Sequence, residues 1–346
     1  MLCDSTEEYV QAINRTGRLV TAAIAASLAG TALATAGPAQ AAAPAHPVSA
    51  KPVGAKPVTT TTTTTKTGTT TAKPAATGPG TITAPYAEIE DDATGTELWG
   101  QSENTEVPMG SITKIMTAIV VLQSSGLDLN QLVTVPDGIT AYDEKYGAST
   151  AGLVPGQQLT TLDLLYALLV PSGCDAAYTL AQAYGPGLDG FIAKMNTTAA
   201  ALGLANTHFT DFSGLPDPTE TSTYSTPSDL IKLGRYAMRI PLIAQIVKTT
   251  SYQVAAVSGE HPAFSWNTTN PLFASGYPGI EGIKTGNTDA AGDCLLFEAY
   301  QGSEDVIGVV LGDPSWSVVT TDAESLLNYG FANFPTGAGW RPRSAG

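Results

Sequence analysis

The chain has few of the residues that build disulfide frameworks and metal centres. It holds three cysteines and three histidines in 346 residues. Cys3 lies in a segment interpreted below as a leader, so an oxidising compartment leaves Cys174 and Cys294 as a conceivable pair. Their expected places, a loop between helices and a strand of a sheet, are unfavourable for disulfide geometry. We expect neither a metal nor another cofactor, because the histidines lack the spacing of metal ligands: His46, His208 and His261.

Positively charged residues are also scarce. The chain has 16 lysines and arginines against 31 aspartates and glutamates, and its formal net charge is −15. Residues 1–41 contribute −1 and residues 42–80 contribute +4, which leaves −18 for the remainder. Binding to nucleic acid or to anionic lipid needs clustered cations, so neither is expected as a partner. In this negative field, Lys284 is a candidate for binding one substrate carboxylate.

Long apolar runs are few, and one of them lies near the amino terminus. Arg15 and Arg18 precede an apolar stretch over residues 19–36, and Ala39-Gln40-Ala41 follows it. This pattern predicts a signal peptide over residues 1–41. The alternative is a membrane anchor, but the many small residues make the stretch weakly apolar, which favours cleavage. We therefore expect a secreted protein without a stable membrane anchor unless the leader is uncleaved.

Residues 42–80 lack the apolar side chains that a folded core needs. They consist mainly of Ala, Pro, Thr, Gly and Lys, with threonine at every position from 59 to 65. This composition predicts a disordered linker, and we favour a spacer over a wall-binding tether. One domain is expected over residues 81–335, followed by a short tail over residues 336–346.

Three short segments carry the residues suited to nucleophilic catalysis. In chain order they are Ser111-Ile112-Thr113-Lys114, Ser172-Gly173-Cys174 and Lys284-Thr285-Gly286. A serine hydroxyl needs an adjacent base, and residues three apart on a helix share one face, so Lys114 can take the proton of Ser111. The base must be neutral, which burial or a second cation such as Lys284 would favour.

Each segment alone is weak evidence. Lys66-Thr67-Gly68 repeats the third segment inside the linker. Ser111 and Lys114 could be a helix cap and a solvated lysine, and Ser172 could cap the helix that follows it. However, Lys114 is the one lysine in the sequence with a serine three positions before it. The three segments in this order therefore favour an active site.

The ordered set matches the Ser-x-x-Lys, Ser-x-Asn and Lys-Thr-Gly motifs of penicillin-binding proteins and serine β-lactamases. Residues 107–118 resemble the nucleophile segment of low-molecular-mass D-alanyl-D-alanine carboxypeptidases. Residues 191–196, 202–203 and 224–226 are similar to the middle section of that family. Residues 282–286, running into 291–295, are similar to its last catalytic strands. The resemblance extends from about residue 85 to about residue 334.

Alternating and apolar patterns place strands at both ends of the domain and helices between them. Strands are predicted over residues 86–91, 97–99, 252–257, 282–286, 293–300 and 305–311. Helices are predicted from Ser111 to residue 122, and over 161–170, 175–184, 188–202, 226–239 and 316–329. The fold class is therefore α/β (α+β), with one antiparallel sheet from both ends of the domain and an inserted helical lobe. The resemblance implies the same β-lactamase/DD-transpeptidase-like fold.

The resemblance also implies catalytic roles. Ser111 would attack the carbonyl between two terminal D-alanines of a peptidoglycan stem peptide, and Lys114 would act as the base. Ser172 would pass a proton to the departing amine. The backbone N–H groups of Ser111 and Asn287 would form the oxyanion hole. The enzyme would work in the cell-wall space and bind β-lactams as covalent inhibitors.

The same resemblance implies substrate-binding roles for the remaining motif residues. Lys284 and Thr285 would hold the terminal carboxylate, and Gly286 on an edge strand would let the substrate backbone approach. Cys174 departs from the commoner asparagine, and a thiol is a weaker donor and acceptor than an amide. Some actinobacterial relatives share the cysteine, so we do not interpret it as inactivation, although Cys174 could also pack away from the cleft.

Three rival functions share much of this pattern. A DD-transpeptidase would use the same residues up to the acyl-enzyme. A class A β-lactamase would need a deacylating carboxylate before Lys284, whereas Glu324 and Asn328 have the wrong spacing and follow it. A silent wall-binding protein would retain the fold without activity, and the intact Ser111, Lys114 and Ser172 argue against it.

Overall fold

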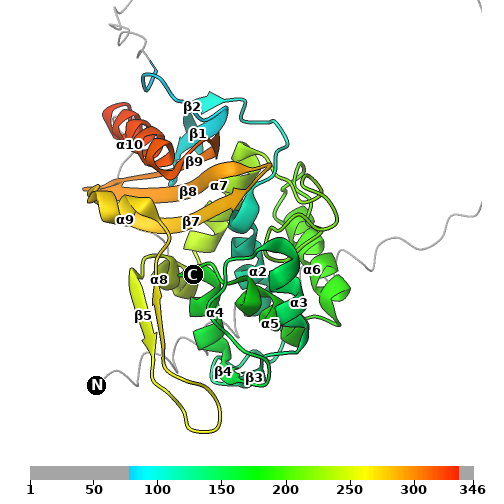
Figure 1. The fold of residues 1–346 in the computed structure, drawn as a ribbon. Helices are drawn as coiled ribbons and strands as arrows, with labels where there is room; N and C mark the ends of the chain where they lie inside the picture. Colours follow the sequence, from blue (N-terminus) through cyan, green and yellow to red (C-terminus); the bar gives the residue numbers. More distant parts are fainter. Residues whose placement is uncertain (1–77, 335–346) are drawn as a thin grey trace, which may run out of the picture. The chain divides into compact units, whose positions relative to one another are not determined.

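The computed structural model describes residues 78–334. The predicted leader, most of the predicted linker with Lys66-Thr67-Gly68, His46 and the predicted tail lie outside the described residues. The described part of the chain forms one compact unit in which segments from both of its ends share a sheet (Figure 1).

The central sheet has five antiparallel strands in the order β2-β1-β9-β8-β7. The strands are β1 (Tyr86–Asp91), β2 (Thr96–Gln101), β7 (Ile280–Thr288), β8 (Gly292–Gln301) and β9 (Glu304–Asp313). The predicted antiparallel sheet from both ends of the domain is therefore confirmed. β7 lies at one edge, as expected for the strand that carries Gly286.

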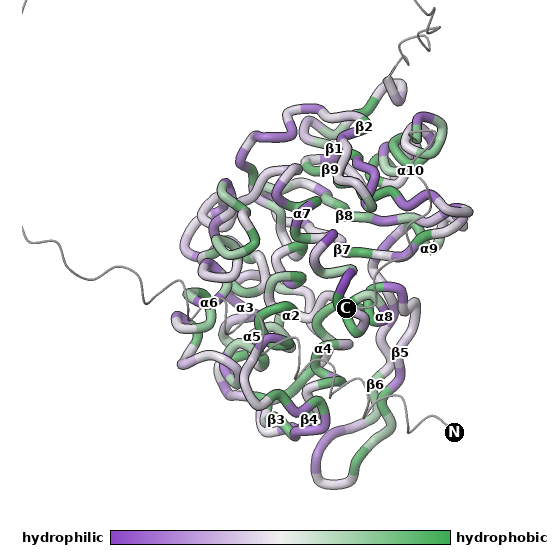
Figure 2. Tube along the Cα trace, turned by 180° about the vertical axis from the view of Figure 1, so that it is seen from behind, coloured by the Kyte–Doolittle hydropathy of each residue, from purple (hydrophilic) through white to green (hydrophobic). Residues whose placement is uncertain are grey.

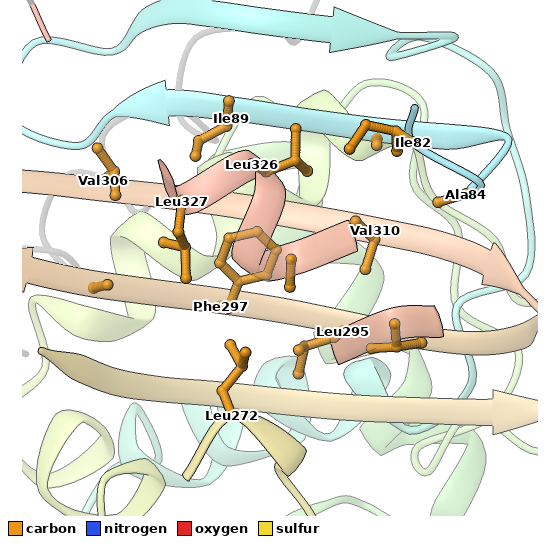
Figure 3. Packing of buried hydrophobic residues seen from close by; sticks show 14 of the residues in the cluster. Ile82, Ala84, Ile89, Leu272, Leu295, Phe297, Val306, Val310, Leu326 and Leu327 are labelled. Carbon is orange, nitrogen blue, oxygen red and sulfur yellow. The ribbon is translucent and has the colours of Figure 1, made fainter. Parts of the chain in front are cut away.

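Helices cover both faces of the sheet. The side chains on both sides of β8 and β9 are therefore buried. α10 (Trp316–Ala332) packs on one face, where Phe297, Leu326 and Leu327 belong to one buried cluster (Figure 3). α7 (Pro227–Met238) packs on the other face, where Gly234 lies close to Leu296. Successive strand residues therefore face different helices, as the two-residue period of a strand requires.

The helical lobe is built around α2 (Lys114–Leu122), all nine residues of which are buried. Figure 2 shows the hydrophobic character of α2 and α4 within the lobe. The other helices are α3 (Gly138–Tyr146), α4 (Thr161–Leu169), α5 (Cys174–Tyr184), α6 (Leu188–Ala201), α8 (Pro241–Val247) and α9 (Pro271–Ser275). No described helix combines the length and apolar character needed to span a bilayer.

Several local features differ from the sequence-based expectations, and α3, α8 and α9 were not predicted. The segment at Ser111 is a short 3-10 helix, η1 (Gly110–Thr113), before α2 begins. The strand expected over residues 252–257 is β5 (Ser251–Val254), which pairs with β6 (Phe264–Asn267) in a separate hairpin. A second small ribbon joins β3 (Leu132–Thr134) to β4 (Gln158–Thr160) and was not predicted.

Candidate active site

The nucleophile segment lies directly against the edge strand β7. A Cβ added to Gly286 would be 2.2 Å from the carbonyl oxygen of Met109, and one added to Gly110 would be 2.5 Å from the backbone nitrogen of Asn287. Only glycine permits such backbone contact. Gly110 also has a φ of +53°, where a side chain adds strain. These two contacts bring Ser111 beside the third motif.

Lys114 is the first residue of α2 and is completely buried. Its Nζ donates to Ser111 Oγ at 2.7 Å and lies 3.3 Å from Ser172 Oγ. Cys174 Sγ is a third neighbour at 3.2 Å. The alternative of a solvated lysine is therefore wrong. One amine joins the first two motifs, which are 58 residues apart.

Ser172 lies between α4 and α5 with a φ of +65°, an uncommon conformation for a residue with a side chain. Gly173 occupies the N-cap position of α5, so the capping alternative for Ser172 is wrong. Ser149 fixes this turn from both sides. Its hydroxyl donates to the carbonyl of Ser172 at 2.8 Å, and its carbonyl accepts from the N–H of Cys174 at 2.8 Å.

Cys174 points toward Lys114 and not away from the cleft, since its sulfur contacts Lys114 Nζ. Cys174 and Cys294 are both buried free thiols. Cys294 lies on β8, where its sulfur donates to the carbonyl of Ala291 at 3.3 Å, and burial raises the pKa of its thiol to about 12. This thiol is therefore unreactive at neutral pH.

The third motif places Lys284 in the interior, with 1% of its surface exposed. Its Nζ donates to the carbonyl of Thr285 at 3.1 Å and lies 3.2 Å from Thr285 Oγ1. Burial, and then the nearby charge of Lys114, hold the pKa of Lys284 well below its usual range. Thr269 contacts Thr285 through the two hydroxyls at 2.6 Å and was not recognised from the sequence.

Asn287 directly follows the third motif, at the contact with the nucleophile segment. Its side chain donates to Asp293 Oδ1 at 2.5 Å, which ties it to β8. Its backbone nitrogen lies at the contact with Gly110, and the backbone nitrogen of Ser111 is 3.2 Å from a Cβ built on Gly286. The two backbone nitrogens assigned to the oxyanion hole are therefore neighbours.

A cleft of about 480 Å³ opens above these residues. All three motifs reach its wall, whereas Lys114 and Lys284 lie buried beneath it. Its lining includes Ser111, Ser172, Thr285, Gly286 and Asn287, together with Tyr146, Ser149, Leu215 and Pro216.

The residues considered for β-lactamase chemistry, and a group of carboxylates that could hold a metal, do not line this cleft. Glu324 and Asn328 are on α10, where Asn328 accepts from the hydroxyl of Tyr277, and neither lines the cleft. Within residues 78–334, one group of carboxylates has ligand atoms within 4.8 Å of one another, and it comprises Asp92, Glu298 and Asp305. None of the three lines the cleft, and Arg235 already donates to Asp92. The absence of a metal stays a prediction.

Comparison with known proteins gives a consistent family. A family profile described as D-alanyl-D-alanine carboxypeptidase, peptidase S11, matches residues 67–315. The D-alanyl-D-alanine carboxypeptidase of Streptomyces sp. (strain K15) is 41% identical over 271 residues, which are 76% of this chain and 91% of that protein. A D-alanyl-D-alanine carboxypeptidase of Mycobacterium tuberculosis is 34% identical over 253 residues, 71% of this chain and 82% of that protein.

Solved structures agree with the architecture. The crystal structure of the Streptomyces K15 DD-transpeptidase matches with a TM-score of 0.71 and 42% identity, covering 74% of this chain and 100% of that one. A D-alanyl-D-alanine carboxypeptidase from Mycobacterium tuberculosis matches with a TM-score of 0.66 and 32% identity, covering 77% and 96%. The fold implied by the sequence motifs is confirmed. The chain belongs to the peptidase S11 family of D-alanyl-D-alanine carboxypeptidases.

Proposed function

We propose that this protein is an exported serine DD-peptidase that removes the terminal D-alanine from peptidoglycan stem peptides. The 2.7 Å contact between Lys114 Nζ and Ser111 Oγ carries the proposal, because it joins a nucleophile in the cleft wall to a buried amine base. The family relatives, which are D-alanyl-D-alanine carboxypeptidases, supply the substrate class.

In the first step, Ser111 Oγ attacks the carbonyl carbon between the two D-alanines, and its proton passes to Lys114 Nζ. The ester bond forms and the C–N bond breaks. The departing amine of D-alanine takes the proton from Lys114 through the hydroxyl of Ser172, which the 3.3 Å contact between the two residues supports. The N–H groups of Ser111 and Asn287 stabilise the oxyanion that forms on the attacked carbonyl.

The terminal carboxylate of the substrate binds to Lys284 and Thr285. Without substrate, burial disfavours the ammonium form of Lys284, and a charge on Lys114 disfavours it further, so the two lysines oppose each other's protonation. An incoming carboxylate supplies the counter-charge that this buried site lacks, so substrate binding favours protonation of Lys284. Gly286 lets the segment of Ser111 lie directly against β7, so that the backbone of this edge strand is beside Ser111, where the substrate backbone would pair with it.

In the second step, water attacks the ester carbonyl, the C–O bond to Ser111 breaks, and the shortened peptide leaves as a carboxylic acid. An amine acceptor in place of water would give a new peptide bond and a DD-transpeptidase. The Streptomyces K15 relative is named a carboxypeptidase in one description and a DD-transpeptidase in another. Cys174 contacts the base that would activate either acceptor, so it is the residue to examine for this balance.

The proposal is tested with a diacylated L-Lys-D-Ala-D-Ala tripeptide and a glycyl amine acceptor, with both products followed by mass spectrometry. We expect mainly the hydrolysed product, and we expect Ser111→Ala to form neither product. A dominant aminolysed product would replace the carboxypeptidase by a transpeptidase. Release of D-alanine by Ser111→Ala at the wild-type rate would refute the role of Ser111.

β-Lactams are proposed to acylate the same serine, because their carbonyl and carboxylate mimic the substrate. Intact-mass spectrometry should show one adduct per protein, lost in Ser111→Ala. Export is a separate proposal that depends on the leader pattern. Expression in an actinobacterial host followed by amino-terminal sequencing should give mature protein outside the cytoplasm that starts near residue 42, and uncleaved protein in the cytosol would contradict it.

A further inference from the structure

Three chain segments press backbone against backbone around the nucleophile, and a glycine lies at each contact. Gly286 and Gly110 form the contacts between β7 and η1 described above. Gly214 forms a third contact on η1, because a Cβ added there would lie 1.9 Å from the carbonyl oxygen of Gly110 and 2.8 Å from Thr113 Oγ1. The segment that carries Ser111 is thus held between β7 and the turn over residues 211–215.

A single buried carboxylate organises that turn. Asp211 is 1% exposed, and its Oδ1 accepts the N–H groups of Ser213 at 2.7 Å, Gly214 at 2.6 Å and Leu215 at 2.9 Å. The hydroxyl of Ser213 donates to the same oxygen at 2.9 Å. These donors compensate the loss of water around the buried charge, so the carboxylate fixes the shape of the turn.

The second oxygen of Asp211 connects the turn to another segment of the cleft wall. The hydroxyl of Tyr142 donates to Oδ2 at 2.6 Å and lies 2.6 Å from Ser213 Oγ. Tyr142 belongs to α3, whose end leads into the cleft-lining residues Tyr146 and Ser149. Burial and the charge of Asp211 raise the pKa of Tyr142, so its hydroxyl keeps the proton that it donates.

We propose that Asp211 and Tyr142 are positioning residues for acylation of Ser111. Asp211 holds Gly214 against Gly110, and the bond to Tyr142 fixes that turn relative to the wall formed after α3. Neither residue touches the reacting atoms. The inference deepens the proposed function and rests on the acyl-enzyme at Ser111.

The absence of a side chain at Gly214 makes the coupling direct. A displaced turn removes its support from the carbonyl of Gly110, the residue immediately before Ser111. Misplacing a reacting group by about 1 Å can slow a reaction about 100-fold. Loss of the Asp211 carboxylate also leaves three backbone N–H groups without their acceptor, so the turn has to rearrange.

Conservative substitutions separate these contributions. Asp211→Ala removes both carboxylate oxygens that accept hydrogen bonds from the turn and from Tyr142. Asp211→Asn retains one oxygen for the three N–H groups, and its amide can donate to Tyr142, whose hydroxyl can then donate to Ser213. Tyr142→Phe keeps the turn itself but removes its bond to α3.

The matched control is Asp322→Ala. Asp322 is 2% exposed on α10, and its carboxylate accepts the N–H groups of Thr83 at 2.5 Å and Ala84 at 2.8 Å. Like Asp211, it is a buried acceptor of backbone donors, but it does not line the cleft or contact the nucleophile segment. It therefore reports what general destabilisation does to the reaction.

The experiment measures the second-order rate constant for acylation by a fluorescent penicillin, with final labelling stoichiometry and thermal unfolding of each variant. We expect Asp211→Ala to acylate about 100-fold more slowly, Tyr142→Phe about fivefold more slowly and Asp211→Asn within threefold of wild type, all reaching one label per molecule. Asp322→Ala should lose thermal stability but acylate within twofold of wild type.

The inference would be overturned if Asp211→Ala is acylated at the wild-type rate. It would also be overturned if Asp211→Ala and Asp322→Ala are acylated equally slowly. If Asp211→Ala yields no soluble protein, an unslowed Tyr142→Phe overturns it instead. A wild-type protein that is never labelled would instead refute the proposed acyl-enzyme, so the two failures are distinguishable.

Discussion

Gly110→Ala should move Ser111 away from the backbone N–H of Asn287, the other donor of the proposed oxyanion hole, with little effect on the rest of the fold. The new Cβ would lie 2.5 Å from the nitrogen of Asn287, whereas ordinary contact begins at 3.4 Å. The two segments must therefore move apart by about 0.9 Å. A displacement of this size at reacting groups predicts acylation slowed by about 100-fold.

The same substitution carries a stability cost that can be estimated separately. Overpacking costs about 1–3 kcal/mol, and alanine at a φ of +53° costs about 1–2 kcal/mol. Gly126→Ala is the matched control, because Gly126 has a φ of +72° but nothing within 4 Å of an added Cβ. It should show the conformational cost alone, about 1 kcal/mol, with unchanged acylation.

Stopped-flow acylation by a chromogenic cephalosporin and urea unfolding would be measured on both variants. Gly110→Ala with wild-type acylation would refute the close-contact argument. Equal losses of acylation in Gly110→Ala and Gly126→Ala would refute the assignment of the effect to the contact with Asn287.

Three further variants test other parts of the molecule. Ser149→Ala removes the hydroxyl bond to the carbonyl of Ser172 and should slow acylation about tenfold while costing only about 1 kcal/mol in urea unfolding; an unchanged rate would contradict its role. Burial and the neighbouring Asp322 raise the pKa of Asp313 from 3.8 to about 7. The unfolded protein therefore binds fewer protons at this position, and the favourable contribution present at pH 4 is lost as the pH rises toward 8. Asp313→Asn should raise stability at pH 8 by about 2 kcal/mol but not at pH 4, measured by thermal unfolding at both pH values; equal effects at both would exclude titration of Asp313. Phe297→Ala should cost about 3–5 kcal/mol in the cluster under α10, and a cost below 1 kcal/mol would show that the core collapses around the cavity.

The order of the three segments and their match to a known motif set predicted Ser111, Lys114, Ser172 and Lys284, although each segment alone has other uses, and the structure brings the first three together. The residues that hold these side chains in place could not be predicted from residue type and order. Ser149 and Asp211 each make their contacts from a loop, and a single polar residue in a loop has no periodicity. Their signal would be the turn geometry, which appears only in the fold.

The helices and strands likewise differ in how well the sequence predicted them. β8, β9 and α10 have long buried patterns and were predicted close to their observed bounds. α3 was missed because Ile139 is its one fully buried residue, so no apolar stripe marks it. β5 was recognised as a strand, but its pairing with β6 depends on a partner that local sequence does not identify.

The pairing of β1 with β9 also determines when this protein can become active during its synthesis. Tyr86 pairs with Leu311, more than 200 positions later. A ribosome releases Ser111 and Lys114 long before the last strands exist, and β7 has no partner until β8 is complete. For much of its elongation the nascent chain therefore carries Ser111 without Asn287, the other residue proposed for the oxyanion hole. The proposed oxyanion hole can therefore form only after the final hairpin has closed the sheet.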